Sequence, residues 1–152
     1  VFLGTGIRLQ ELIGLNIEDV DLETKHLHIR SAKGGVPQVK FLHTRLRGLL
    51  RAYLKWRLRQ GTEQCPALFI SQRDARISPR QVAYRLDYWL REAGIDKALT
   101  PHSLRHTFAT RLYARTNDLL VVQRALGHRQ IATTEIYTHL VDGTLEEALE
   151  RL

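Results

Sequence analysis

The sequence predicts a mainly helical domain with one small antiparallel sheet, a fold of the α+β class. In several segments, apolar residues recur at helical spacing between proline and glycine punctuation. In one segment, residues 19–42, apolar and polar residues instead alternate as they do in a strand. The chain has 152 residues, which is enough for a single domain with a core of its own.

The first predicted element is a short helix over residues 8–15. It follows Gly6, which breaks any preceding helix, and it carries Leu12 and Leu15 at helical spacing. The next segment, 19–42, is predicted to form a β-hairpin or meander. Leu27 and Ile29 alternate there with polar residues.

The turn of this hairpin is predicted at Gly34–Gly35, which places Lys33 at its tip. A side chain at a hairpin tip is poorly placed for packing and well placed to reach a ligand. After the hairpin, residues 44–61 predict an amphipathic helix that stops at Gly61. Its arginines are expected to cover the solvent side. The apolar stripe of this helix comprises Leu46, Leu49, Leu50, Tyr53, Leu54 and Leu58.

The second half of the chain is predicted to be helical after a short extended piece at "ALFIS". A helix over 78–94 has Ser78 as its cap, a proline at its first position and Gly94 at its end. Further helices are predicted over about 101–115 and 117–126, around Tyr137, and in the terminal segment "TLEEALERL".

The charge of the chain favours a polyanionic partner such as nucleic acid. Lys and Arg total 23 against 16 Asp and Glu, a formal net charge of +7. The lone Cys65 cannot form an internal disulfide, and no apolar run approaches the length of a membrane span, so we expect a protein that works inside the cell without a membrane. An apolar run is already in progress at residue 1, from which we expect a longer protein with an upstream domain.

The segment "PHSLRHTFAT" concentrates basic and proton-carrying residues at one helix start. His102, Arg105 and His106 share one side of the predicted helix, and Leu104, Phe108 and Leu112 form the stripe expected to face the core. His102 and His106 have the spacing of a metal pair. However, Ser103 stands where a zinc protease carries its glutamate, and Arg105 would repel a cation. We therefore expect an anion site here, with no metal, while the alternative for any single residue is an ordinary capped, solvated helix end.

Three separated segments, "TGIRLQEL", "PHSLRHTFAT" and "LGHRQIATTEIYTHL", resemble the tyrosine recombinase family of phage integrases and Xer-type recombinases. Their order and spacing agree with the family from about residue 3 to about residue 140. The resemblance implies the catalytic-domain fold of DNA breaking-rejoining enzymes over residues 1–152. It also implies an N-terminal core-binding domain outside this chain.

The resemblance carries the family's site onto individual residues. Arg8 and Arg105 match the two arginines that clamp the scissile phosphate, and Tyr137 matches the nucleophile. His102 matches the histidine expected to manage the proton of the tyrosine. His128 matches a position that donates a hydrogen bond to the phosphate.

The lysine of the site is expected in the hairpin. Lys33 matches the family lysine that protonates the leaving 5′ oxygen, although the basic residues that usually follow it are missing here; Lys40 is a weaker candidate for this role. Glu11 and His106 match supporting positions, which orient or buttress the site without acting chemically.

The function implied by the resemblance is site-specific DNA recombination through a covalent 3′-phosphotyrosine, without a cofactor. The expected partner is double-stranded DNA, bound by a homo-tetramer in the cytoplasm of a bacterium, on its nucleoid. The terminal helix is expected either to dock on a neighbouring subunit or to pack on its own. Two alternatives are a type IB topoisomerase and a DNA-binding module without catalytic activity.

Overall fold

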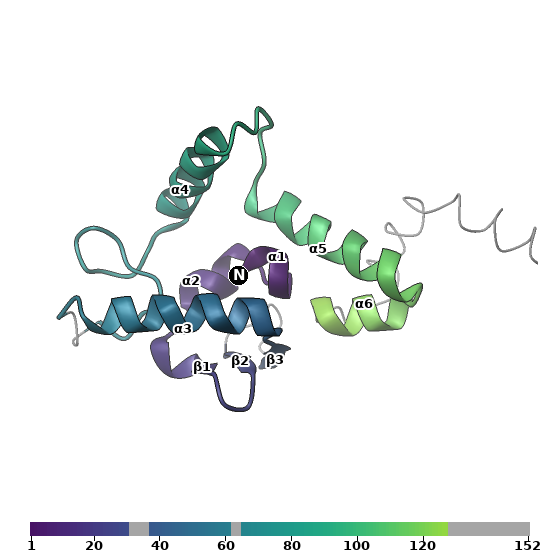
Figure 1. Cartoon of the computed structure of the whole chain (residues 1–152), viewed down its shortest axis with the longest axis horizontal. Coiled ribbons are helices and arrows are strands. Elements are labelled where there is room, and N and C mark those ends of the chain that lie inside the picture. The colour runs from purple at the N-terminus through teal and green to yellow at the C-terminus, as the bar shows by residue number, and fades with distance from the viewer. Residues whose placement is uncertain (31–36, 62–64, 128–152) are drawn as a thin grey trace, which may run out of the picture.

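The computed structural model describes residues 1–30, 37–61 and 65–127. Within these ranges the chain is mainly helical with a three-stranded antiparallel sheet, which confirms the predicted fold class (Figure 1). None of the helices in the described ranges is long and apolar enough to cross a membrane. The elements are α1 (Phe2–Thr5), α2 (Leu9–Gly14), the 3-10 helix η1 (Ile17–Asp19), β1 (Val20–Asp21), β2 (His26–Ile29), β3 (Gln38–Phe41), α3 (Thr44–Leu58), α4 (Pro79–Glu92), α5 (Pro101–Thr116) and α6 (Leu119–Leu126).

The sheet has the strand order β1-β2-β3. On its buried face, β2 carries apolar side chains and β3 carries polar ones. Leu27 and Ile29 of β2 are buried, as their alternation predicted. They pair directly with Lys40 and Gln38 of β3. Because directly paired residues lie on the same face of a sheet, two polar side chains of β3 point to the side where β2 carries apolar ones.

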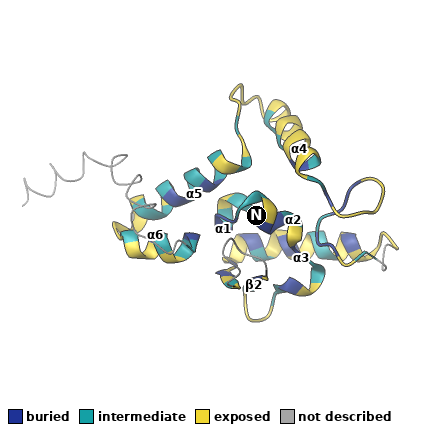
Figure 2. Cartoon of the chain, turned by 180° about the vertical axis from the view of Figure 1, so that it is seen from behind, coloured by how far each residue is buried: buried dark blue, intermediate teal, exposed yellow. Residues whose placement is uncertain are grey.

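The main core lies between the sheet, α2, α3 and the extended segment after α3 (Figure 2). α3 and α2 contribute the helical side of this core, and α4 contributes only one fully buried residue, Val82. Figure 1 shows α4 projecting away from the rest of the molecule. The buried apolar residues of the main core are Ile7, Leu12, Leu15, Leu27, Ile29, Leu42, Leu46, Leu50, Leu68, Ile77 and Val82.

The prediction for α3 was correct at its start, but the helix ends at Leu58 rather than at Gly61, and the prediction was wrong in part about its faces. Leu49 and Leu58, assigned to the apolar stripe, are exposed. Arg57, expected to face solvent, is buried, and its Nη2 donates to the carbonyl oxygen of Cys65 at 2.8 Å. The segment that returns after α3 presents backbone carbonyls to the helix, and these require a donor that no apolar side chain supplies.

The predicted caps of α4 are present. The Ser78 hydroxyl accepts from the backbone N–H of Gln81 at 3.3 Å, and Gln81 Oε1 accepts from the backbone N–H of Ser78 at 2.9 Å, which together form a capping box. Gly94 follows the helix with a φ of 66°, the left-handed conformation typical of a helix end.

Helices α5 and α6 form a second, smaller apolar cluster. Ala109, Val122 and Leu126 are buried there, with Phe108 and Leu112 packed against them. The predicted stripe on α5 is thus confirmed for Phe108 and Leu112, and α5 also contacts α1. Leu104, the third residue of that stripe, is half-buried.

Candidate active site

Arg8 and Glu11 form a pair at the start of α2. The backbone N–H of Arg8 donates to Glu11 Oε2 at 2.7 Å, and Nη1 of Arg8 donates to Glu11 Oε1 at 2.7 Å. The Glu11 side chain is 2% exposed and the Arg8 side chain 29%. Glu11 therefore fixes the guanidinium from the buried side, while part of the Arg8 side chain stays accessible to solvent. From the sequence, Glu11 was assigned a supporting position, and the structure places its carboxylate on Arg8.

Arg105 is 5% exposed and joins three parts of the chain. From α5, its Nη1 donates to the carbonyl oxygen of Gly6 and its Nη2 donates to that of Leu126 at 3.0 Å. The prediction that α5 presents this guanidinium on its solvent side was wrong. Arg105 and Ala109 form the buried line of the helix, because the carbonyls at the ends of α1 and α6 lie there.

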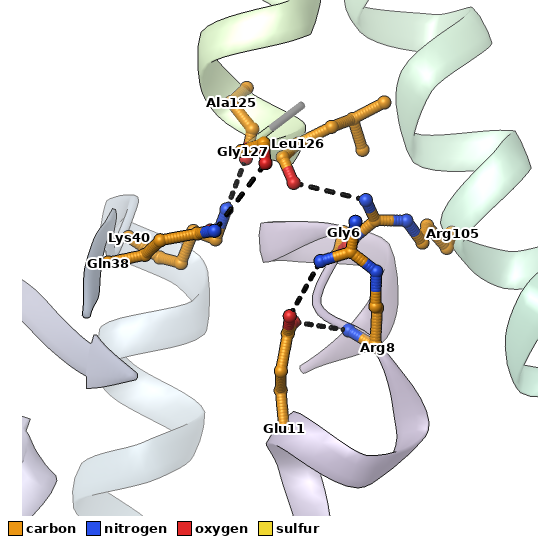
Figure 3. A network of polar contacts seen from close by, with 9 residues as sticks. All are labelled: Gly6, Arg8, Glu11, Gln38, Lys40, Arg105, Ala125, Leu126 and Gly127. Carbon is orange, nitrogen blue, oxygen red and sulfur yellow. Dashed lines mark hydrogen bonds and ion pairs between the residues drawn. The ribbon is translucent and has the colours of Figure 1, made fainter. Parts of the chain in front are cut away.

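The two arginines predicted from separate segments meet around Gly6 (Figure 3). Arg105 binds the carbonyl of Gly6, which stands two residues before Arg8 in the chain. Gly6 has a φ of 61°, and a side chain at this position would collide with Phe108 of α5. The glycine therefore permits both the turn into α2 and the close approach of α5.

Lys40 approaches the same region from β3. Its Nζ donates to the carbonyl oxygen of Ala125 at 2.6 Å, and the residue is 5% exposed. Burial lowers the pKa of Lys40 to about 8; the positive charges of Arg105 and Arg8 add to this effect, and Glu11 opposes it. From the sequence, Lys40 was only a substitute for Lys33. The pairing of β3 with the apolar face of β2 is the signal that could have identified it as buried.

Gln38 completes the contacts of β3 with the end of α6. Its Nε2 lies 3.5 Å from the carbonyl oxygen of Gly127, and a side chain at Gly127 would overlap the Gln38 amide. The last carbonyls of a helix lack partners within the helix and carry partial negative charge. Here three consecutive carbonyls, those of residues 125–127, receive donors from Lys40, Arg105 and Gln38 (Figure 3). We call these three side chains the carbonyl clamp.

The two predicted histidines of α5 differ in exposure. His102 lies in the first turn and is exposed, one helical turn before Arg105. His106 is half-buried, with its Nδ1 3.5 Å from the Thr110 hydroxyl. Lys33, His128 and Tyr137 lie outside the described residues.

The groups brought together are suited to an anion. Arg8, Arg105 and Lys40 oppose the single carboxylate of Glu11, so the cluster is positive when all four are ionised. Guanidinium groups bind phosphate through two parallel hydrogen bonds, which fixes its orientation as well as its charge. The arrangement can stabilise negative charge that increases on a phosphate during a reaction.

Residues 1–143 match the sequence profile of the phage integrase family. The chain is 38% identical over 151 residues to the tyrosine recombinase XerA of Pyrococcus furiosus, with 97% of this chain and 51% of that protein aligned. It is 34% identical over 157 residues to the tyrosine recombinase XerC of Natranaerobius thermophilus, with 99% of this chain and 52% of that protein aligned. The chain thus spans about half the length of these relatives.

Solved structures agree with the sequence relatives. A crystal structure of XerA recombinase matches with a TM-score of 0.87 at 38% identity, covering 99% of this chain and 54% of that one. The XerH site-specific recombinase bound to a palindromic difH substrate, a post-cleavage complex, matches with a TM-score of 0.80 at 31% identity, covering 97% of this chain and 42% of that one.

Proposed function

This chain belongs to the phage integrase family, and on that premise we propose that it is the catalytic domain of a site-specific DNA recombinase. The proposed enzyme cleaves and rejoins DNA strands through a covalent 3′-phosphotyrosine. The observation that carries the proposal is the convergence of Arg8 and Arg105 around Gly6, with Glu11 behind Arg8. Two arginines from distant segments supply the positive field that a phosphoryl-transfer site without a metal requires.

In the proposed reaction, the phenolic oxygen of Tyr137 forms a bond to phosphorus, and the bond from phosphorus to the 5′ oxygen breaks. His102 accepts the phenolic proton, and Lys33 donates a proton to the leaving 5′ oxygen. Rejoining reverses these steps with a 5′ hydroxyl from another strand. The phosphotyrosine retains the energy of the phosphodiester, so no external energy source is required.

The remaining site residues stabilise the charge that develops. Arg8 and Arg105 stabilise the non-bridging oxygens of the attacked phosphate, and His128 donates a hydrogen bond to one of them. Glu11 orients Arg8, and its two 2.7 Å hydrogen bonds support this role. His106 buttresses α5 next to Arg105, in agreement with its partial burial.

The proposed biological unit is larger than this chain. Residues 1–152 would work with an upstream domain that encloses the other face of the DNA. Four copies would assemble on double-stranded DNA of the bacterial nucleoid through exchange of the C-terminal helix. The XerH structure with its difH substrate, at 31% identity, supports DNA as the partner.

A nicked suicide DNA duplex tests the proposal. The short fragment between the scissile phosphate and the nick, which carries the released 5′ hydroxyl, diffuses away once the strand is cut, so a covalent protein–DNA adduct accumulates. We expect the adduct with the intact protein that carries this chain, and none with Tyr137→Phe. A DNA-binding module would bind the duplex without forming an adduct. A topoisomerase would form the adduct but rejoin only the strand that it cut, whereas the proposed recombinase also joins strands of two different duplexes.

A further inference from the structure

The carbonyl clamp holds the end of α6 from two sides. Arg105 contacts it from α5, and Lys40 and Gln38 contact it from β3. The helix so held ends at Leu126 and is capped by Gly127. Because Lys40 and Arg105 bind consecutive carbonyls, those of Ala125 and Leu126, the end of α6 links β3 to Arg105.

Fold stability does not explain why a lysine occupies position 40. Its side chain is buried on the sheet face where its partner on β2 is Leu27. Burying an ammonium costs more free energy than one hydrogen bond to a neutral carbonyl returns. An apolar side chain paired with Leu27 would satisfy the sheet at lower cost. What the lysine adds is a directed contact between β3 and the last turn of α6, 85 residues apart in sequence.

We propose that Lys40 is a positioning residue, which fixes the end of α6 on β3 and thereby holds Arg105, which binds the adjacent carbonyl of Leu126, in place next to Gly6 and Arg8. This inference rests on the proposed function, because it concerns the same reaction. It assigns Lys40 a role different from that of Lys33, which donates a proton. Gln38 assists it through its contact with Gly127.

The charges around Lys40 connect this position to the phosphate. Arg8 and Arg105 repel the ammonium, Glu11 attracts it, and its hydrogen-bond acceptor on α6 is the uncharged carbonyl of Ala125. A phosphate bound at the arginines would offset their repulsion and favour the charged form of Lys40. A charged donor binds a carbonyl more strongly than a neutral amine does. Phosphate binding should therefore strengthen the contact with Ala125.

The experiment measures adduct formation in a single turnover on the nicked suicide duplex, at saturating DNA, with the intact protein. The variant is Lys40→Met, and the matched control is Lys55→Met, which removes the same charge from an exposed position of α3. We expect Lys40→Met to slow the reaction about tenfold to a hundredfold, the effect of a small misplacement of reacting groups. Its Kd for the duplex should stay within about threefold of the wild-type value, since many other cations contact DNA. Lys55→Met should retain the wild-type rate.

A second substrate separates positioning from proton donation. In a duplex with sulfur in place of the bridging 5′ oxygen, the leaving thiolate needs no proton. Lys40→Met should be slowed to the same extent on both substrates. Recovery of its rate on the sulfur substrate would overturn the inference, because Lys40 would then be the acid.

The possible failures are distinguishable. A wild-type protein that forms no adduct overturns the proposed function, and the inference falls with it. If the wild-type protein forms the adduct and Lys40→Met forms it at the same rate, the inference is overturned and the proposed function stands. Rates are compared at a temperature at which circular dichroism shows both proteins to be folded. If Lys40 only stabilised the fold, Lys40→Met would then react at the wild-type rate at saturating DNA.

Discussion

The main core and the carbonyl clamp are two regions held together in different ways. In the main core, aliphatic side chains from α2, α3 and the sheet exclude water from one another, an interaction without direction. In the clamp, Lys40, Arg105 and Gln38 each reach one backbone carbonyl, an interaction that depends on distance and angle. The core thus stabilises the fold without regard to direction, whereas the clamp joins β3, α5 and the end of α6 at defined positions.

Two buried arginines allow this comparison to be tested with the same substitution, arginine to alanine, made in each region. Arg57 in α3 and Arg105 in α5 both donate to backbone carbonyls, but only Arg105 lies in the clamp. We expect Arg105→Ala to lower adduct formation by at least about a thousandfold, because in the proposed reaction Arg105 stabilises transition-state charge. Duplex binding, measured by gel shift, should largely survive since other basic residues share the phosphate contacts.

For Arg57→Ala we expect the opposite pattern. It leaves the carbonyls of Cys65 and Ala67 without their donor and should lower the free energy of unfolding by about 1 to 3 kcal/mol. Adduct formation by the folded fraction should remain near the wild-type rate. Two outcomes would remove the distinction between the two regions. One is that Arg105→Ala loses DNA binding and cleavage equally; the other is that Arg57→Ala slows adduct formation as much as Arg105→Ala does.

A pair of glycines gives a test of stability. Gly6 has a φ of 61° and lies against Phe108, while nothing lies within 4 Å of a Cβ at Gly14. Gly6→Ala should lower the free energy of unfolding by about 2 to 4 kcal/mol, through backbone strain and overpacking. Gly14→Ala, at an exposed helical position, should raise it by about 0.4 to 1 kcal/mol. Urea unfolding of both variants measures the effects, and a neutral Gly6→Ala would show that α5 does not need this close approach.

The pKa of Lys40 predicts a pH dependence of stability. The pKa is about 8 in the folded chain against 10.5 for an unperturbed lysine. Between these values the unfolded chain binds more protons than the folded one, so this lysine makes stability rise with pH, by up to about 1.4 kcal/mol per unit. The gain in stability that comes from deprotonating Lys40 is complete above pH 10.5 and is lost as the pH falls to 8.

The measurement compares urea midpoints of the wild type and Lys40→Met from pH 7 to pH 10. All other residues are common to the two proteins, so the difference between the two curves isolates Lys40. We expect the wild type to gain stability relative to Lys40→Met as the pH rises through this range. Parallel curves would mean that Lys40 titrates normally and is not buried as a cation.

The sequence predicted the main core better than the clamp, for a physical reason. Periodic apolar residues and local caps such as Ser78 act over a few neighbouring positions, so α4 and the strand alternation of Leu27 and Ile29 could be read directly. The burial of Arg105 could not, because the carbonyl of Gly6 that it binds is 99 residues away. The family resemblance named Arg105 and Arg8 and gave Lys40 only as a weaker candidate for the role of Lys33; the burial of Lys40 follows from the strand register.

The smallest predicted effect concerns Gln38, whose contact with Gly127 is long. Its Nε2 lies 3.5 Å from the Gly127 carbonyl oxygen, and its Oε1 has no hydrogen-bond partner among the described residues, whereas Lys40 donates at 2.6 Å. If directed hydrogen bonds hold this region together, a substitution that removes a long bond should have a smaller effect than one that removes a short bond. Gln38→Leu, which keeps the volume, should change the free energy of unfolding by less than about 1 kcal/mol and slow adduct formation only severalfold. A rate loss equal to that of Lys40→Met would instead mean that the shape of the contact, rather than its hydrogen bonds, holds the end of α6.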